Sequence, residues 1–305
     1  NFKDPNEFLL DQKADDFVAS WDGAKRYAPD NIISDFSDID KALEEQEEDL
    51  LAEYPFDGLN EKLFALYAGD VVVVKAQEGV GKTEFFRSFE HHVLKTTQTK
   101  IGVIHLEEDN ATTIKALAGY ELGVPATLPT SGLSRKDILE GYKKAVGGDS
   151  SRVHIYQSFD IEDEQSFYGN IRFLGRAAGC RIIFLDHISW LGTGLTDDDE
   201  RKKLDRISQK LKLLAKELKI AIVMISHVND EGKTRGSRNI SKVANIVLSI
   251  SRDVAGGESQ TSMVVEKARL GGRTGPAGYY WFDQLTGTLV AKPPAYLMEE
   301  EDDGT

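Results

Sequence analysis

The residues whose types and spacing best suit a chemical reaction lie in a short glycine-containing loop after position 76. Four valines at positions 71–74 predict a buried strand before the loop, and Phe85 and Phe86 resume a helical pattern behind it. Backbone N–H groups at the start of such a helix bind a β-phosphate, while Lys82 reaches the β- and γ-phosphate oxygens and the Thr83 hydroxyl ligates Mg²⁺. The residues that we predict to bind nucleotide are Gln77, Glu78, Gly79, Val80, Gly81, Lys82, Thr83 and Glu84.

Polar residues follow three other apolar stretches, at the points where further strands of the same sheet would end. Glu107 could orient or deprotonate an attacking water, and Asp186 ends an apolar strand in the Walker B pattern that holds Mg²⁺ through water. His227 could donate a hydrogen bond to a γ-phosphate. The plainer alternatives are that Glu107 and Glu108 are acids favoured at a helix N-terminus and that His227 is structural.

A basic loop rich in glycine follows His227. Cations and small donors without an apolar anchor suit contacts to a phosphate backbone, which carry no sequence information. A solvated surface loop is the alternative. The residues that we predict to bind single-stranded DNA are Asn229, Lys233, Arg235, Gly236, Ser237, Arg238 and Lys242.

Lys267 and Arg269 are two spaced cations at the end of a later predicted strand. A guanidinium offered to the γ-phosphate of a neighbouring subunit would neutralise charge in the transition state. Within one subunit Arg269 has no clear role, and surface cations beside a turn are the alternative.

The elements that must position these residues alternate from residue 63 onward. Strands are predicted near 70–75, 101–106, 153–158, 181–186 and 220–226, with helices near 82–97, 110–121, 134–146, 163–178 and 200–218. This alternation predicts an α/β fold with a mainly parallel sheet covered on both faces and ligands at the carboxyl ends of its strands. Shorter strands near 244–251, 260–268 and 277–283 suggest an antiparallel extension.

The ends of the chain differ in composition from its centre. The net charge is −14, but residues 1–62 hold 18 acidic and 6 basic residues, and Glu299 to Asp303 are five acids in a row. Acidity at the ends therefore says little about what the central domain binds. Residues 1–28 predict one or two short helices, and residues 37–53 predict a helix whose apolar stripe needs a partner, either the domain's own core or a neighbouring subunit.

Two features bear on the compartment and on the extent of the chain. Cys180 is the lone cysteine, which excludes a disulfide framework and suits a reducing cytosol, and its apolar neighbours predict a core position. No apolar run long enough to span a membrane is present, so we expect a cytoplasmic protein without a membrane partner. The first residue is Asn1, inside a predicted helix, and we expect a fragment of a longer chain.

Taken together, these motifs resemble the helicase half of a phage-type primase-helicase, among the DnaB-like hexameric helicases of superfamily 4. The resemblance spans about residues 55–292 and rests on Lys267-Ala268-Arg269 followed by 274–279, and on Arg235-Gly236-Ser237 followed by 244–247. Ala76, in place of the usual first glycine of the loop, fits as well. The implied fold is RecA-like, with residues 1–30 as the end of a TOPRIM-like primase domain, 31–58 as an acidic helical linker that packs on a neighbouring subunit, 59–292 as the helicase domain and 293–305 as an acidic tail.

The resemblance also implies roles for single residues. Glu107 matches the catalytic glutamate, Asp186 the Walker B acid, His227 the phosphate sensor, Arg269 the arginine finger that acts on a neighbour, and Lys267 its companion. Arg252 and Phe282 stand where the family clamps the nucleotide base, although 279–282 offers several rings. Lys242 departs from the glutamine that is usual there: a lysine could strengthen a phosphate contact but could not pass a γ-phosphate signal through an amide.

We therefore expect a replicative DNA helicase motor that hydrolyses ATP or dTTP with Mg²⁺ and moves along single-stranded DNA as a homo-oligomeric, hexameric ring. The further partners implied are an upstream primase domain and a DNA polymerase bound by the acidic tail, in the host bacterial cytoplasm. A disordered, solvating tail is the alternative. A filament-forming RecA-like recombinase and an ATPase that only holds an assembly are the rival functions.

Overall fold

A computed structural model describes residues 5–10, 13–23, 33, 35–44, 49–156, 164–188, 191, 197–227, 238–252, 260–269 and 271–297. The chain divides into two compact units, Asn1–Glu47 and Glu48–Thr305. In the first unit the described helices are α1 (Pro5–Leu10), α2 (Ala14–Asp22) and α3 (Phe36–Glu44). Ile39 and Leu43 are one turn apart and therefore share one side of α3.

The predicted helix over residues 37–53 is wrong for residues 49–53, while residues 45–48 lie outside the described part of the chain. Residues of β1 (Leu50–Ala52) are extended and pair antiparallel with β2 (Leu66–Tyr67). Tyr54 and Phe56, which follow β1, are buried in the core of the second unit. Burial of such aromatic side chains outweighs a weak local preference for helix. Leu51, Ala52, Tyr54 and Phe56 therefore belong to the core of the second unit, although they precede residue 59, where the helicase domain was predicted to begin.

One mixed sheet organises the second unit, and among the described residues it has nine strands in the order β11-β10-β9-β8-β3-β7-β6-β4-β5. The strands are β3 (Val71–Ala76), β4 (Ile101–His105), β5 (Val153–Ile155), β6 (Ile182–Asp186), β7 (Ala221–His227), β8 (Ile246–Ser251), β9 (Gln260–Ala268), β10 (Gly275–Asp283) and β11 (Thr288–Val290).

The predicted parallel sheet with an antiparallel extension is confirmed. Strands from β8 through β3, β7, β6 and β4 to β5 pair parallel, whereas β8, β9, β10 and β11 pair antiparallel in sequence. One detail differs, because β8 was expected in the antiparallel extension but also pairs parallel with β3. β8 is thus the strand at which the sheet changes direction.

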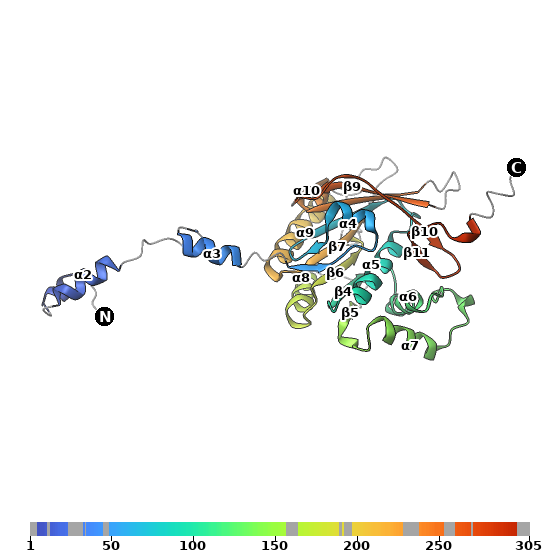
Figure 1. Ribbon diagram of the computed structural model, residues 1–305, viewed down its shortest axis with the longest axis horizontal. Coiled ribbons are helices and arrows are strands. Elements are labelled where there is room, and N and C mark those ends of the chain that lie inside the picture. The colour runs from blue at the N-terminus through green and yellow to red at the C-terminus, as the bar shows by residue number, and fades with distance from the viewer. Residues whose placement is uncertain are drawn as a thin grey trace. The chain divides into compact units, whose positions relative to one another are not determined.

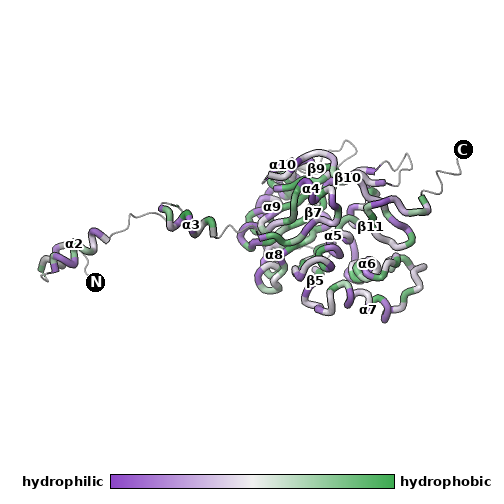
Figure 2. Tube along the Cα trace, in the orientation of Figure 1, coloured by the Kyte–Doolittle hydropathy of each residue, from purple (hydrophilic) through white to green (hydrophobic). Residues whose placement is uncertain are grey.

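Helices cover both faces of this sheet (Figure 1), as the parallel pattern predicts. Val72 and Val74 of β3 face α4 (Asp57–Leu63) and α5 (Lys82–Thr96), whereas Val71 and Val73 face α8 (Glu164–Arg172), α9 (Asp197–Leu218) and α10 (Arg238–Val243). The apolar strands lie between more polar helical surfaces (Figure 2). Cys180 is buried, as predicted. Within the described residues, no helix combines the length and apolar character needed to cross a bilayer.

The remaining helices lie in the connections between strands. α6 (Asn110–Leu122) and α7 (Arg135–Ala145) follow β4 and pack against each other, with the short helical turns η1 (Pro129–Ser131) and η2 (Ser150–Arg152) nearby in sequence. A π-helix, η3 (Phe173–Ala177), continues α8. The side chain of Asp109 accepts a hydrogen bond from the Thr112 backbone N–H at 2.7 Å, which fixes the start of α6 directly after the end of β4.

Candidate functional site

The loop of residues 77–81 connects β3 to α5 at the carboxyl edge of the parallel strands. Gly79 and Gly81 have φ angles of 77° and 94°, in the left-handed region that disfavours other residues. Open space surrounds both positions, so it is the backbone conformation that requires glycine there. α5 begins at Lys82, and its first N–H groups face this loop with the positive end of the helix dipole. The local geometry is that of an anion cradle.

Lys82, Thr83 and Asp186 form the polar part of the cradle. Thr83 Oγ1 donates a hydrogen bond to Asp186 Oδ2 at 2.8 Å, which joins the start of α5 to the end of β6. Burial lowers the pKa of Lys82, and the charges of Asp186, Glu78 and Glu107 oppose that effect. Burial raises the pKa of Asp186, against the charge of His105 and the Thr83 hydrogen bond. A bound polyanion would stabilise the charged form of Lys82, and a cation carried by that polyanion would stabilise the charged form of Asp186.

Glu107 and Glu108 differ sharply in environment although they are neighbours at the end of β4. The Glu107 side chain is 49% exposed, and its Oε1 lies 2.8 Å from Nε2 of His187. Glu108 is 16% exposed and pairs with Arg87 at 2.5 Å. Glu107 is therefore the carboxylate that a water in the cradle can reach, and Glu108 is committed to contacts within the fold.

The pKa of Glu108 reflects those contacts. Burial alone would raise it, but hydrogen bonding to His105 and the charges of Arg87 and His105 outweigh burial and lower the pKa of Glu108 to about 2. Burial likewise would lower the pKa of His105, but the Glu90 carboxylate and hydrogen bonds to Glu108 and Glu90 raise it to about 10. Both side chains are consequently charged at neutral pH.

A second region of the site lies beside the loop, on the side of β10. A pocket of about 180 Å³ is lined by Val80, Gly81, Glu84, Arg252, Thr261, Tyr280, Phe282 and Leu289. Arg252 Nη2 donates to the carbonyl of Gly79 at 2.8 Å, which ties the end of β8 to the loop. Of the rings at 279–282, Tyr279 is exposed, whereas Tyr280 and Phe282 line the pocket. The structure thus brings Arg252 and Phe282 together beside the loop, and their role in holding a base stays a prediction.

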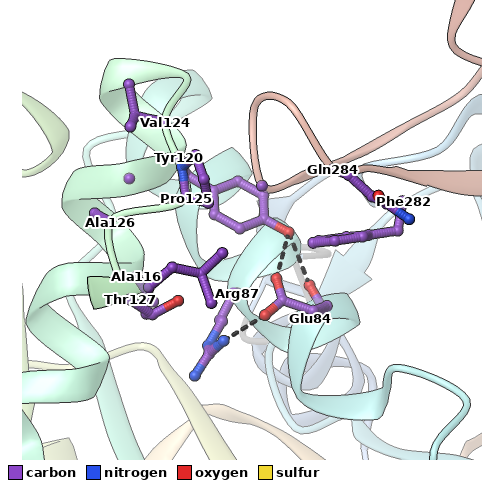
Figure 3. Close-up of a pocket in the computed structure, with 13 residues that line it drawn as sticks. Glu84, Arg87, Ala116, Tyr120, Val124, Pro125, Ala126, Thr127, Phe282 and Gln284 are labelled. Atoms are coloured by element: carbon purple, nitrogen blue, oxygen red, sulfur yellow. Dashed lines mark hydrogen bonds and ion pairs between the residues drawn. The ribbon is translucent and has the colours of Figure 1, made fainter. Parts of the chain in front are cut away.

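An adjacent pocket of about 420 Å³ shares Glu84 and Phe282 with the first and extends to α6. In Figure 3 the side chains of Glu84, Arg87 and Tyr120 point toward one another, and Phe282 lies across from Tyr120. The Tyr120 hydroxyl lies 3.2 Å from Glu84 Oε2, and Arg87 Nη1 forms an ion pair with Glu84. Glu84 is therefore the residue common to both pockets and is held from two sides.

Lys267 and Arg269 lie at the amino-terminal end of the parallel strands, whereas the phosphate loop lies at their carboxyl end. β9 runs antiparallel to β8, so Ala268 pairs with Ile246, which in turn pairs with Val72 near the start of β3. The loop begins after Ala76, four residues and about 13 Å further along β3. Arg269 is exposed and cannot join the phosphate loop of its own chain.

The two cations contact the end of α10. Lys267 Nζ donates to the carbonyls of Ser241 and Lys242, each at 2.8 Å, and Arg269 Nη2 donates to that of Lys242 at 3.1 Å. The side chain of Lys242 is exposed. These contacts connect the predicted finger strand with the helix that follows the predicted DNA loop.

Several predicted residues lie outside the described part of the chain. Residues 228–237, including Asn229, Lys233, Arg235, Gly236 and Ser237, and the tail from residue 298 are among them. The side chains of His227 and Arg238 are also outside the description, although the backbone of His227 pairs with Ala76 at the carboxyl edge. Their roles stay predictions.

The structure adds residues that the sequence analysis did not single out. His187 faces Glu107, Arg87 and Tyr120 surround Glu84, and Thr261 and Tyr280 line the pocket beside the loop. The sequence could have pointed to His187, because this residue directly follows Asp186 at the end of a predicted strand. No group of three or more His, Cys, Asp or Glu residues that could hold a metal occurs within the described residues. A cation at the cradle would depend on Thr83, Asp186 and a bound phosphate.

Comparison with known proteins gives a consistent assignment. Residues 53–287 match the family of the DnaB-like helicase C terminal domain. The DNA helicase/primase of Enterobacteria phage T3 is 28% identical over 306 residues, which cover 92% of this chain and 53% of that protein. The replicative DNA helicase DnaB of Geobacillus stearothermophilus is 25% identical over 228 residues, 68% of this chain and 49% of that protein. The chain therefore spans about half the length of these relatives.

Solved structures share the fold. A DnaB-like replicative helicase, studied with its interactions with primase, superposes with a TM-score of 0.66 at 17% identity, covering 94% of this chain and 75% of that one. A second solved structure, of an ATPase domain, superposes with a TM-score of 0.67 at 18% identity, covering 84% of this chain and 96% of that one. The RecA-like arrangement of strands and helices that the sequence predicts is confirmed.

Proposed function

The chain belongs to the family of DnaB-like helicase C-terminal domains, and on that premise we propose that it is an NTP-hydrolysing motor that moves along single-stranded DNA as a hexameric ring. One observation carries the proposal: the phosphate loop lies at the carboxyl end of the parallel strands, and Arg269 lies at their amino-terminal end. One copy therefore supplies the loop and the next copy supplies the arginine. Head-to-tail contacts of this kind repeat around a ring when the rotation closes.

The nucleotide, ATP or dTTP, binds with its phosphates on the loop and its base between Arg252 and Phe282. The residues present suit Mg²⁺, because the Thr83 hydroxyl and the Asp186 carboxylate lie 2.8 Å apart and Mg²⁺ takes one or two protein oxygens with phosphate and water. When bound, Mg²⁺ neutralises charge on the phosphate oxygens. Lys82 supplies positive charge from the protein side, at the first residue of α5.

Hydrolysis requires a water aligned with the γ-phosphate, and Glu107 orients it. Its carboxylate is half exposed at the edge shared with the loop, and the contact with His187 holds it in place. Arg269 of the next copy stabilises the charge that develops on the γ-phosphate, an effect worth roughly 10³–10⁵ in rate in other NTPases. His227 senses the γ-phosphate at the same edge, and Lys267 assists Arg269.

The proposed partners are single-stranded DNA, further copies of this chain and a primase. The residues at 229–242 contact the DNA backbone, and the exposed Lys242 belongs to the same surface. A primase is proposed because the phage T3 relative is a DNA helicase/primase and the superposed DnaB-like helicase interacts with primase. Contact between the acidic tail and a DNA polymerase, and a location in the host bacterial cytoplasm, complete the proposal.

The experiment that tests the function is steady-state hydrolysis of ATP and dTTP with and without single-stranded DNA, beside electron-microscope images of the same sample. Closed rings whose hydrolysis rises strongly with DNA, and is lost in Lys82→Ala, are expected. Filaments on DNA would favour a recombinase instead. Rings whose hydrolysis ignores DNA would favour an ATPase that only maintains an assembly.

A further inference from the structure

A buried network of charged side chains joins α5, β4 and α6 directly beside Glu107. From α5 come Glu84, Arg87 and Glu90, spaced three residues apart, so that Arg87 neighbours both carboxylates on the helix surface. His105 is the last residue of β4, and Glu108 follows it three residues later. The network therefore connects the helix that begins at the phosphate loop with the strand end that carries the predicted catalytic carboxylate.

Each link of the network is a short polar contact. Arg87 donates from Nη2 to Glu108 Oε2 at 2.5 Å and from Nη1 to Glu84. Glu108 Oε1 lies 2.8 Å from His105 Nδ1, and His105 Nε2 lies 2.9 Å from Glu90 Oε1. Figure 3 shows the outer end of the network, where Tyr120 and Arg87 meet Glu84. Five charged side chains from two elements thus form one connected chain.

The network is largely removed from water. The side chains of Glu90 and His105 are 0% and 2% exposed, and those of Arg87 and Glu108 are 12% and 16% exposed. Buried ion pairs commonly stabilise a fold no better than apolar residues of similar volume, because desolvation offsets the attraction. Their better attested use is to fix one geometry among alternatives.

The network holds the segment of the chain that carries Glu107. His105 and Glu108 lie on either side of Glu107, at −2 and +1, so the backbone that carries Glu107 is held on both sides. Glu107 itself is half exposed, and the described contact of its side chain is with His187. Arg87 then fixes this backbone to α5, one helical turn after Thr83.

We propose that Arg87, by bridging Glu84 and Glu108, is a positioning residue for hydrolysis: it sets where Glu107 stands relative to the phosphate loop. The proposal rests on the proposed NTPase function and deepens it. Arginine suits this task because its planar fork offers separate nitrogens to two carboxylates, whereas a lysine offers one point charge. A shift of Glu107 by about 1 Å would cost on the order of 100-fold in rate.

The test compares Arg87→Lys and Glu108→Gln with the unchanged chain in DNA-stimulated hydrolysis. Both variants should lower kcat at least about tenfold, while KM and nucleotide affinity stay within about threefold, because the loop itself is intact. Arg87→Lys keeps the buried charge and serves as the second variant should Glu108→Gln not fold. A kcat within about twofold of the unchanged chain in both variants would overturn the proposal.

Glu121→Gln is the matched control. Glu121 of α6 is 14% exposed and pairs with His91 and Lys95 of α5, at 3.1 and 3.0 Å, so it joins α5 and α6 at comparable burial without touching β4. This control should lose stability as Glu108→Gln does but keep its kcat. An equal loss of kcat in Glu121→Gln would mean that any weakening between these elements slows the reaction, and would overturn the assignment.

A double variant separates positioning from general damage. A residue that acts through Glu107 has nothing left to position in Glu107→Gln, so adding Glu108→Gln should lower single-turnover rates no further. If Glu108→Gln lowers the single-turnover rate by the same factor in Glu107→Gln as in the unchanged chain, the proposal is contradicted. An unchanged chain that hydrolyses no NTP would overturn the proposed function and this inference together, whereas normal hydrolysis with unaffected variants would overturn the inference alone.

Discussion

Replacement of Arg269 by alanine should abolish hydrolysis and leave the fold and nucleotide binding intact. The Arg269 side chain is exposed, and its guanidinium donates to the Lys242 carbonyl at 3.1 Å. Loss of a contact at such a position costs at most about 0.5 kcal/mol, which lowers the melting temperature by about 2 °C or less in a domain of this size. Stability therefore cannot account for a large loss of activity.

The expected effect on rate follows from where Arg269 lies. Arg269 follows the end of β9, which lies level with Val72, about 13 Å along β3 from the start of the phosphate loop. Arg269 therefore adds nothing to nucleotide binding by its own chain. An arginine supplied by a neighbour contributes roughly 10³–10⁵ in rate. That range corresponds to about 4–7 kcal/mol of transition-state stabilisation.

Phosphate release in the presence of single-stranded DNA measures the rate, and fluorescence of a labelled nucleotide measures affinity. Arg273→Ala is the matched control, because Arg273 is also exposed and lies between the same two strands, β9 and β10. It should keep its rate within about twofold. Hydrolysis by Arg269→Ala within about tenfold of the unchanged chain, or an equal loss in Arg273→Ala, would refute the reasoning.

Three further predictions concern the described site. Phe282→Ala should raise KM for nucleotide several-fold by removing a wall of the pocket beside the loop, whereas Tyr279→Ala, at an exposed ring of the same strand, should not; equal KM values in steady-state assays would count against the base site. Gly81→Ala should weaken nucleotide binding and cost about 1–2 kcal/mol in denaturant unfolding, because φ is 94° there. Gly169→Ala, at an open position inside α8, should instead stabilise the fold by up to about 1 kcal/mol, and similar losses in both variants would contradict this. The pKa of Glu108 is about 2 in the fold and about 4.5 as its ordinary value, so its carboxylate stabilises the fold above pH 4.5 and that contribution is lost as pH falls toward 2. Melting temperatures of the unchanged chain and Glu108→Gln should converge over this range, and a constant difference would be the contrary result.

The sequence predicted which strand ends lie side by side, because a parallel sheet imposes its own geometry. Once the strands before Gly79, Glu107 and Asp186 were predicted, their carboxyl ends had to share one edge. The hydrogen bond between Thr83 and Asp186 is a direct result of that register. The position of Arg269 depends on strand direction, because the antiparallel pairing of β9 with β8 places Arg269 at the amino-terminal end of the parallel strands.

Other features depended on contacts that no local pattern carries. Leu50 and Leu51 fit a helical stripe, but their segment pairs with β2 and leads into buried aromatic residues. Arg87 lies within a predicted helix and belongs to no motif, and the role proposed for it depends on carboxylates 3 residues before it and 21 residues after it. Such pairings become visible only when the fold brings distant positions together.

The central claim is that each reaction centre is shared between two copies of the chain, and mixing two inactive variants tests it most directly. Lys82→Ala keeps the arginine but lacks the loop lysine, and Arg269→Ala has the reverse defect. In rings assembled at random from equal amounts, about a quarter of the interfaces join an intact loop to an intact arginine. Hydrolysis that returns on mixing, toward about a quarter of the unchanged rate, is the predicted result. Mixed rings as inactive as either variant alone would contradict a shared site.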